Sequence, residues 1–132
     1  MTYSVRHVSV PIEKPYDEVY AFLATPANMA KWASGLGRDF HKIGEHEWET
    51  EGPLGKVRVR FTPHNAFGIV DHDVTPEGAA PMNNPMRVFR NDQGSEVVFS
   101  VLRRGDPSDA AFEEDCATVE SDLRVLKALL EG

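Results

Sequence analysis

SDAAFEEDCATVESDLRVLKALLE, residues 108–131, is the most regular stretch of this 132-residue sequence. Its apolar residues recur at alternating steps of four and three, the spacing that places them on one side of a straight α-helix. They are Phe112, Cys116, Val119, Leu123, Leu126 and Leu130, with Val125 and Leu129 widening that side near the end. Ser108 is the predicted N-cap. Such a helix buries its apolar side only against a broad apolar surface, which the remaining residues must form.

Residues 3–36 are predicted to form a first strand and two short helices, which supply part of that surface. Residues 3–10 are rich in Val and Tyr and predict a strand. Pro15 is typical of a first helical turn, and the spacing of the apolar residues that follow predicts a short helix. Thr25 and Pro26 then predict the N-cap and first position of a second short helix, which ends near Gly37. The apolar sides of these helices are Val19, Phe22 and Leu23 in the first, and Met29, Trp32 and Ala33 in the second.

From residue 38 onward the sequence predicts strands separated by short turns. The predicted strands are residues 38–43, 46–51, 56–62, 67–75, 82–90 and 96–103. Residues 52–55, Pro-Gly-rich like the other links, predict one of the turns between them. Strands with links this short pair mostly with their neighbours, as an antiparallel meander. Pro85 interrupts one strand and predicts either an edge position or a bulge.

Composition and charge limit the classes of protein to which the chain can belong. Apolar residues make up 41% and charged residues 27%, as in globular proteins, and the length predicts a single domain over residues 1–132. A net charge of −7 argues against a nucleic-acid partner and against binding to anionic membranes. Cys116 is the only cysteine, and neither a signal segment nor a long apolar run is present. We therefore expect a cytoplasmic protein without a membrane span.

Four segments resemble one known group of proteins. They are IEKPYDEVYAFL (residues 12–23), TPANMAKW (residues 25–32), FGIVDHDV (residues 67–74) and NPMRV (residues 84–88). Together with the order of elements, they resemble the START-like, or SRPBCC, superfamily and its bacterial members labelled polyketide cyclase/dehydrase-like. The resemblance implies an α+β helix-grip fold. In that fold a curved antiparallel sheet of about seven strands is crossed by the long C-terminal helix, with two short helices after the first strand.

The same resemblance implies a cavity between the sheet and the C-terminal helix. The residues expected to line it are Trp32, Phe40, Trp48, Phe61, His72, Val88, Phe99, Phe112, Val119 and Leu123. A site of this kind is mostly apolar with a few polar groups. The alternative is that these side chains simply fill a solid core.

His72 is the polar candidate with the clearest chemistry. Adjacent strand residues point to opposite faces, and Asp71 and Asp73 are far less costly outside the core than inside it. That pattern predicts an inward His72, although Phe67 and Ile69 would then share the outer face with the aspartates. An imidazole there could act in general acid–base chemistry on a carbonyl substrate. The alternative is a neutral histidine with one hydrogen-bond partner in the cavity wall.

Arg87 and Asn84 are the other polar candidates. An inward Arg87 would bind a carboxylate or polarise a carbonyl, whereas an outward one would be solvated. Asn84 precedes Pro85 and could shape a turn. His41 and the segment around His46 lack metal-ligand spacing, so we expect no metal and no cofactor.

Three functions follow from these residues. The preferred one is binding of a small hydrophobic or amphipathic molecule in the internal cavity. The second is a cyclase or dehydratase that uses His72 or Arg87 on a carbonyl substrate, and the third is a protein-interaction module. The sequence does not decide whether the protein forms a homodimer through an edge strand or a helix.

Overall fold

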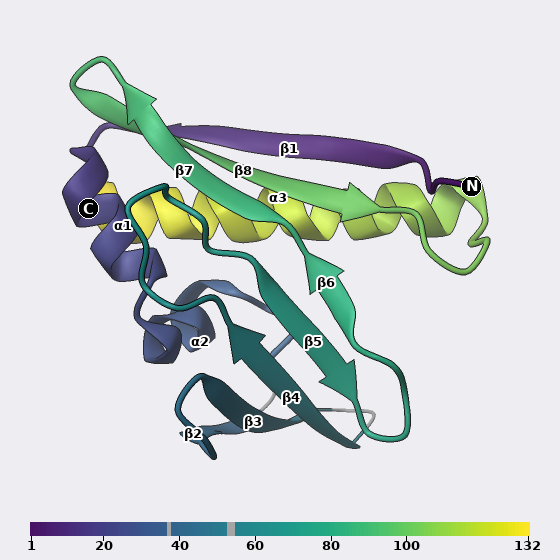
Figure 1. The fold of residues 1–132 in the computed structure, drawn as a ribbon. Helices are drawn as coiled ribbons and strands as arrows, with labels where there is room; N and C mark the ends of the chain where they lie inside the picture. Colours follow the sequence, from purple (N-terminus) through teal and green to yellow (C-terminus); the bar gives the residue numbers. More distant parts are fainter. Residues whose placement is uncertain (37, 53–54) are drawn as a thin grey trace.

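The computed structural model describes residues 1–36, 38–52 and 55–132, and has the predicted α+β architecture of strands and helices (Figure 1). The elements are β1 (Val5–Ile12), α1 (Tyr16–Leu23), the 3₁₀ turn η1 (Pro26–Asn28), α2 (Met29–Trp32), β2 (Arg38–Lys42), β3 (Glu47–Gly52), β4 (Gly55–Phe61), β5 (His72–Pro76), β6 (Met82–Asn84), β7 (Met86–Asn91), β8 (Gly94–Leu102) and α3 (Asp109–Glu131). Gly37 and part of the predicted turn at residues 52–55 lie outside the described residues.

The strands form two antiparallel sheets, in the orders β1-β8-β7 and β2-β3-β4-β5-β6. The predicted strand over residues 82–90 is divided between them at Pro85. Its first part, β6, pairs with β5, and its second part, β7, pairs with β8. The Pro85 carbonyl accepts a hydrogen bond from the Ser100 amide at 2.9 Å. Pro85 therefore marks the point where the chain passes from one sheet to the other.

Helix α3 runs along β1 and β8 and buries the predicted apolar side against them (Figure 1). It begins as predicted, because the Ser108 hydroxyl oxygen accepts a hydrogen bond from the Ala111 amide at 3.1 Å. The prediction for Val125 and Leu129 is wrong, since their side chains are 42% and 46% exposed. The buried arc is narrower than the pattern indicated because only one face of the helix meets the sheet. No helix in the described part of the chain is long and apolar enough to cross a membrane.

The short helices lie at the end of the molecule where α3 ends, and α2 packs beside α3 (Figure 1). Their buried side chains are Val19, Leu23, Met29 and Trp32. Thr25 does not form the predicted cap. Its hydroxyl instead donates to the Ala21 carbonyl at 2.8 Å, one turn back in α1.

The segment before β5 is a tight loop, so the predicted strand over residues 67–75 begins only at His72. The Asn65 side chain organises this loop. Its oxygen accepts from the amides of Phe67 and Ile69, and its nitrogen donates to the Ile69 carbonyl. Gly68 follows with a φ of +70° and packs against the backbone of β7. Asn65 thus satisfies part of the loop's backbone, the Gly68 carbonyl and the Val70 amide hydrogen-bond to β7, and Phe67 is left exposed.

Candidate functional site

A cavity of about 220 Å³ lies between the sheet and the helices α2 and α3. Residues from α2, the segment after it, β4, β5, β6, β8 and α3 form its wall. They are Met29, Trp32, Ala33, Gly35, Leu36, Val57, His72, Val74, Pro76, Asn84, Phe99, Val119 and Asp122. Ten of these are apolar or glycine, and His72, Asn84 and Asp122 supply the polar side chains. The wall thus has the composition expected of a small-molecule site.

His72 points inward, as the alternation around it predicts, and its side chain is only 4% exposed. The imidazole lies between two aromatic rings, with centroid distances of 6.2 Å to Phe61 and 5.9 Å to Phe99. Both neighbouring aspartates accept hydrogen bonds from other residues and not from His72. Asp71 accepts a hydrogen bond from the Met86 amide, and Asp73 accepts one from Asn83.

Burial sets the charge state of His72. Desolvation lowers its pKa, and the backbone carbonyl of Val70, followed by Asp71 and Asp73, opposes this shift only in part. The ring is therefore neutral near pH 7. Its Nδ1 atom lies 3.3 Å from the Val70 carbonyl oxygen. A carbonyl oxygen can only accept, so Nδ1 carries the ring proton.

We expect this buried histidine to make stability depend on pH. Below the ordinary histidine pKa of about 6.5, an unfolded His72 takes up a proton that the folded protein resists. The free energy of unfolding should therefore decrease as the pH is lowered from about 6.5 to the lowered pKa of His72 in the folded protein. The decrease should be up to about 1.4 kcal/mol per pH unit. Urea melts between about pH 7.5 and 5.0 measure this slope. The His72→Phe variant retains the other histidines and should have a shallower slope, and equal slopes would contradict the assignment.

Three other predicted wall residues form an aromatic row that continues from His72 away from the cavity. Phe40 stacks on Trp48 with their centroids 4.9 Å apart, and its edge meets Phe61 at 6.3 Å. Phe61 in turn contacts His72. All three are half-buried on β2, β3 and β4, and none of them lines the 220 Å³ cavity.

The remaining predicted wall residues divide into two groups. Trp32, Phe99 and Val119 line the cavity together with His72. Val88 and Leu123 are buried in the closed core instead. Phe112 lies near the start of α3 beneath two guanidinium groups, with Arg6 at 5.3 Å and Arg103 at 5.4 Å from its ring centroid. That ring covers one end of the helix and does not line the cavity.

Arg87 does not reach the cavity. It alternates with the buried Met86 and Val88 on β7, so its side chain lies on the outer face. There it pairs with Asp71, with 2.9 Å between the guanidinium nitrogen and the carboxylate oxygen. Of the two orientations that the sequence left open, the outward one is therefore observed, and of the two candidate catalytic groups only His72 lines the cavity.

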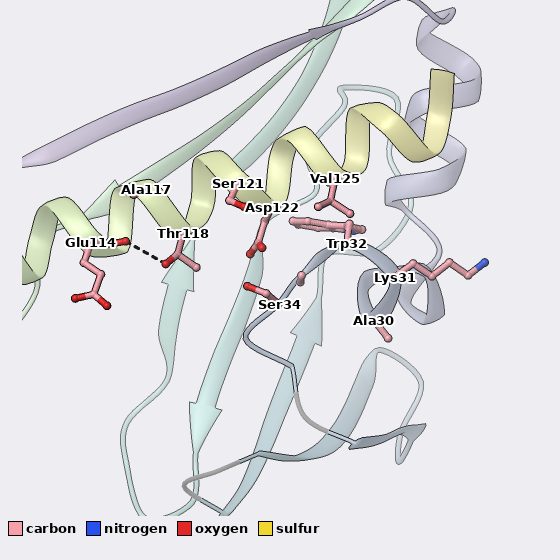
Figure 2. A pocket seen from close by; sticks show the side chains of 11 residues that line it. Ala30, Lys31, Trp32, Ser34, Glu114, Ala117, Thr118, Ser121, Asp122 and Val125 are labelled. Atoms are coloured by element: carbon pink, nitrogen blue, oxygen red, sulfur yellow. Dashed lines mark hydrogen bonds between the residues drawn. The ribbon is translucent and has the colours of Figure 1, made fainter. Parts of the chain in front are cut away.

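Asp122 of α3 was not among the residues predicted to line the cavity. Asp122 is half-buried and lines both the cavity and an open groove of about 500 Å³ between α2 and α3. Trp32 and Ala33 also border both spaces. Figure 2 shows the Trp32 indole below Val125, and Asp122 extending from α3 toward Ser34. The available signal was that Asp122 lies three residues after Val119, at the border of the apolar side.

No His, Cys, Asp and Glu side chains among the described residues gather in a group of three that could hold a metal ion. His41 lies instead beside the carboxylates of Asp39 and Glu49, and His46 beside that of Glu45.

Comparison with known proteins identifies the architecture. No protein-family model matches the chain, and no curated protein matches it. Among solved structures, the Aha1 dimer from Colwellia psychrerythraea is similar, with a TM-score of 0.74, 16% identity, and 97% of this chain and 96% of that chain covered.

Two further solved structures have the same architecture. DynU16, a protein of the dynemicin biosynthetic locus, has a TM-score of 0.71 and 15% identity, with 96% of this chain but 47% of that chain covered. Ara h 8.0201 has a TM-score of 0.69 and 8% identity, with 96% of this chain and 97% of that chain covered. Likeness at this level of identity concerns the fold alone, and it shows that this chain adopts the helix-grip fold.

Proposed function

We propose that this protein binds a small, mostly apolar molecule in the cavity between the sheet and the helices α2 and α3. The observation that supports this is the cavity itself, about 220 Å³ of space walled mostly by apolar side chains. A concave, mostly apolar space with a few polar side chains is the usual form of a small-molecule site. A ligand of matching size would cover apolar side chains that border solvent in this partly open cavity.

The volume limits the size of that occupant. Drug-sized ligands need roughly 300–1,000 Å³, whereas an apolar cavity of about 150 Å³ accommodates benzene. A cavity of about 220 Å³ therefore suits one ring with small substituents. Trp32, Phe99 and His72 offer it aromatic contacts from α2, β8 and β5.

Support for a cyclase or dehydratase is narrower. Arg87 faces outward, so only one of the two predicted catalytic groups is available. The neutral His72 could accept a proton, but among the described residues no guanidinium group lines the cavity wall to polarise a carbonyl. Binding is thus the function that the described residues support best.

Filling the cavity tests this proposal. We expect toluene to bind the wild-type protein and to shift the backbone amide resonances of residues in the wall. In Val119→Phe the new ring occupies the same space, so the dissociation constant should rise at least about tenfold. Titrations followed by two-dimensional NMR measure both constants.

Val125→Phe is the matched control, because Val125 lies on the same helix but lines the open groove and not the cavity. Its affinity for toluene should equal that of the wild type. Equal weakening in both variants, or shifts confined to residues far from the wall, would reject the cavity as the binding site.

A further inference from the structure

We infer that the cavity selects a neutral ligand that donates a hydrogen bond, an O–H or an N–H group, with Nε2 of His72 as the acceptor. This inference rests on the proposed function, and it adds the chemical class of the ligand. It is carried by the polar groups of the wall and by the direction in which each can hydrogen-bond.

The first step is the orientation of the His72 ring. Nδ1 donates its proton to the Val70 carbonyl, 3.3 Å away on the same segment. Nε2 is then the nitrogen with a free lone pair, and it makes no hydrogen bond to any residue that the structure describes. The ring is more than nine-tenths buried, and it lines the cavity as well as a shallow groove beside β4. None of the buried side-chain nitrogen and oxygen atoms in the described residues lacks a partner, so Nε2 is in contact with solvent. A ligand that displaces this solvent must supply a donor in its place, so a ligand with a donor is favoured over one without.

The second step concerns the opposite side of the wall, where α3 places Asp122. Its carboxylate can only accept hydrogen bonds, and it makes neither a hydrogen bond nor an ion pair with any described residue. No Lys or Arg is found among the described residues that line the cavity. Lys31 borders the neighbouring groove, but Figure 2 shows its side chain extending away from Asp122.

These two acceptors discriminate between classes of ligand. A carboxylate would place a second negative charge near Asp122, with no cation in the described wall to compensate for it. An ether or ketone oxygen would face the lone pair of Nε2 and leave it unpaired. A phenol, an alcohol or an aromatic amine of about one ring satisfies Nε2 and brings no negative charge. The Asn84 side chain can donate and accept hydrogen bonds, so it does not discriminate between these classes of ligand.

The tautomer can be measured on the wild-type protein without any ligand. Two-dimensional NMR that correlates the ring nitrogens of His72 with its carbon-bound protons should show a protonated Nδ1 and an unprotonated Nε2 at about pH 7.5. A ring protonated at Nε2 would overturn the inference, because that nitrogen would then donate.

Ligand preference is tested with phenol and anisole as probes, which differ in whether the oxygen carries a proton. The measured quantity is the anisole dissociation constant divided by that of phenol. Comparing this ratio between proteins removes the difference in hydrophobicity between the two probes. We expect the ratio to fall about fivefold to tenfold from wild type to His72→Phe, which keeps a buried ring but removes the acceptor.

Benzoate tests the expectation that the cavity excludes negatively charged ligands. Its binding should be at least about tenfold weaker than that of phenol in the wild type, and the benzoate dissociation constant divided by that of phenol should fall in Asp122→Asn. A ratio that does not respond to Asp122→Asn would overturn the exclusion of anions.

The outcomes separate the two proposals. If toluene and anisole bind but the ratio of anisole to phenol is unchanged in His72→Phe, the cavity is a binding site and the donor preference is wrong. If neither toluene nor any of the oxygen-bearing probes binds the wild-type protein, the proposed function fails and this inference fails with it.

Discussion

Gly68→Ala is expected to lower the free energy of unfolding by roughly 3–5 kcal/mol. Gly68 has a φ of +70°, and a Cβ atom there would lie 2.0 Å from the Val88 carbonyl oxygen. That oxygen belongs to the backbone of β7 and cannot move by a rotamer change. The loop would have to withdraw, which would break the bond from the Val88 amide to the Gly68 carbonyl. The neighbouring bond, from the Val70 amide to the Met86 carbonyl, would be strained as well.

Gly78→Ala is the matched control for this variant. Gly78 has a similar φ of +77°, but nothing lies within 4 Å of the position that a Cβ atom would take there. Its substitution carries only the cost of an alanine in the left-handed region, about 1–2 kcal/mol. Urea melts of both variants measure the difference. Equal losses in the two variants would mean that the close approach of Gly68 to β7 does not add to the cost of the substitution.

The Gly68 contact also bears on the cavity. It joins the loop before β5 to β7, and β5 begins at His72 immediately after that loop. We expect a destabilised Gly68→Ala protein to lose the fixed orientation of the His72 ring before it loses its secondary structure. The ring-nitrogen resonances of His72 would report this change.

Leu123→Ala is expected to cost roughly 2–5 kcal/mol of stability. Leu123 is only 1% exposed and lies in the core between α3 and the sheet. Truncation removes buried methyl groups and leaves a space that the surrounding strands fill only in part. Chemical denaturation at fixed pH gives the change in the free energy of unfolding.

Leu129→Ala provides the comparison on the same helix with the same change of side chain. Leu129 is 46% exposed, so its loss should lie within about 0.5 kcal/mol of zero. Similar losses at positions 123 and 129 would mean that α3 does not lie on the sheet by the face assigned to it.

Much of the fold could be predicted because the local alternation of apolar and polar residues indicates it. In β4, for example, Val57 and Val59 lie inward and Arg58 between them lies outward, the alternation that is typical of a strand with one buried face. The same rule predicted the inward His72 from the two aspartates beside it. It failed for residues 67–71, where hydrogen bonds from Asn65 hold a loop that competes with a strand.

The candidate site could be predicted only in part. Trp32, Phe99 and Val119 line the cavity, whereas Val88 and Leu123 are also apolar and are fully buried but do not line it. Nothing in the local pattern separates these groups. The difference depends on how far α2 and α3 stand from β5, and residues far apart in the sequence determine that distance.

Periodicity determined the positions of most strands and helices and of their apolar faces, because a side chain's direction follows from its position in a regular element. Tertiary structure decided where the packing leaves a void, why Arg87 pairs with Asp71 outside it, and how Asp122 comes to border it. The physical reason is that a void is a property of the space between elements. Its shape, and the set of polar side chains that border it, exist only once those elements have packed together.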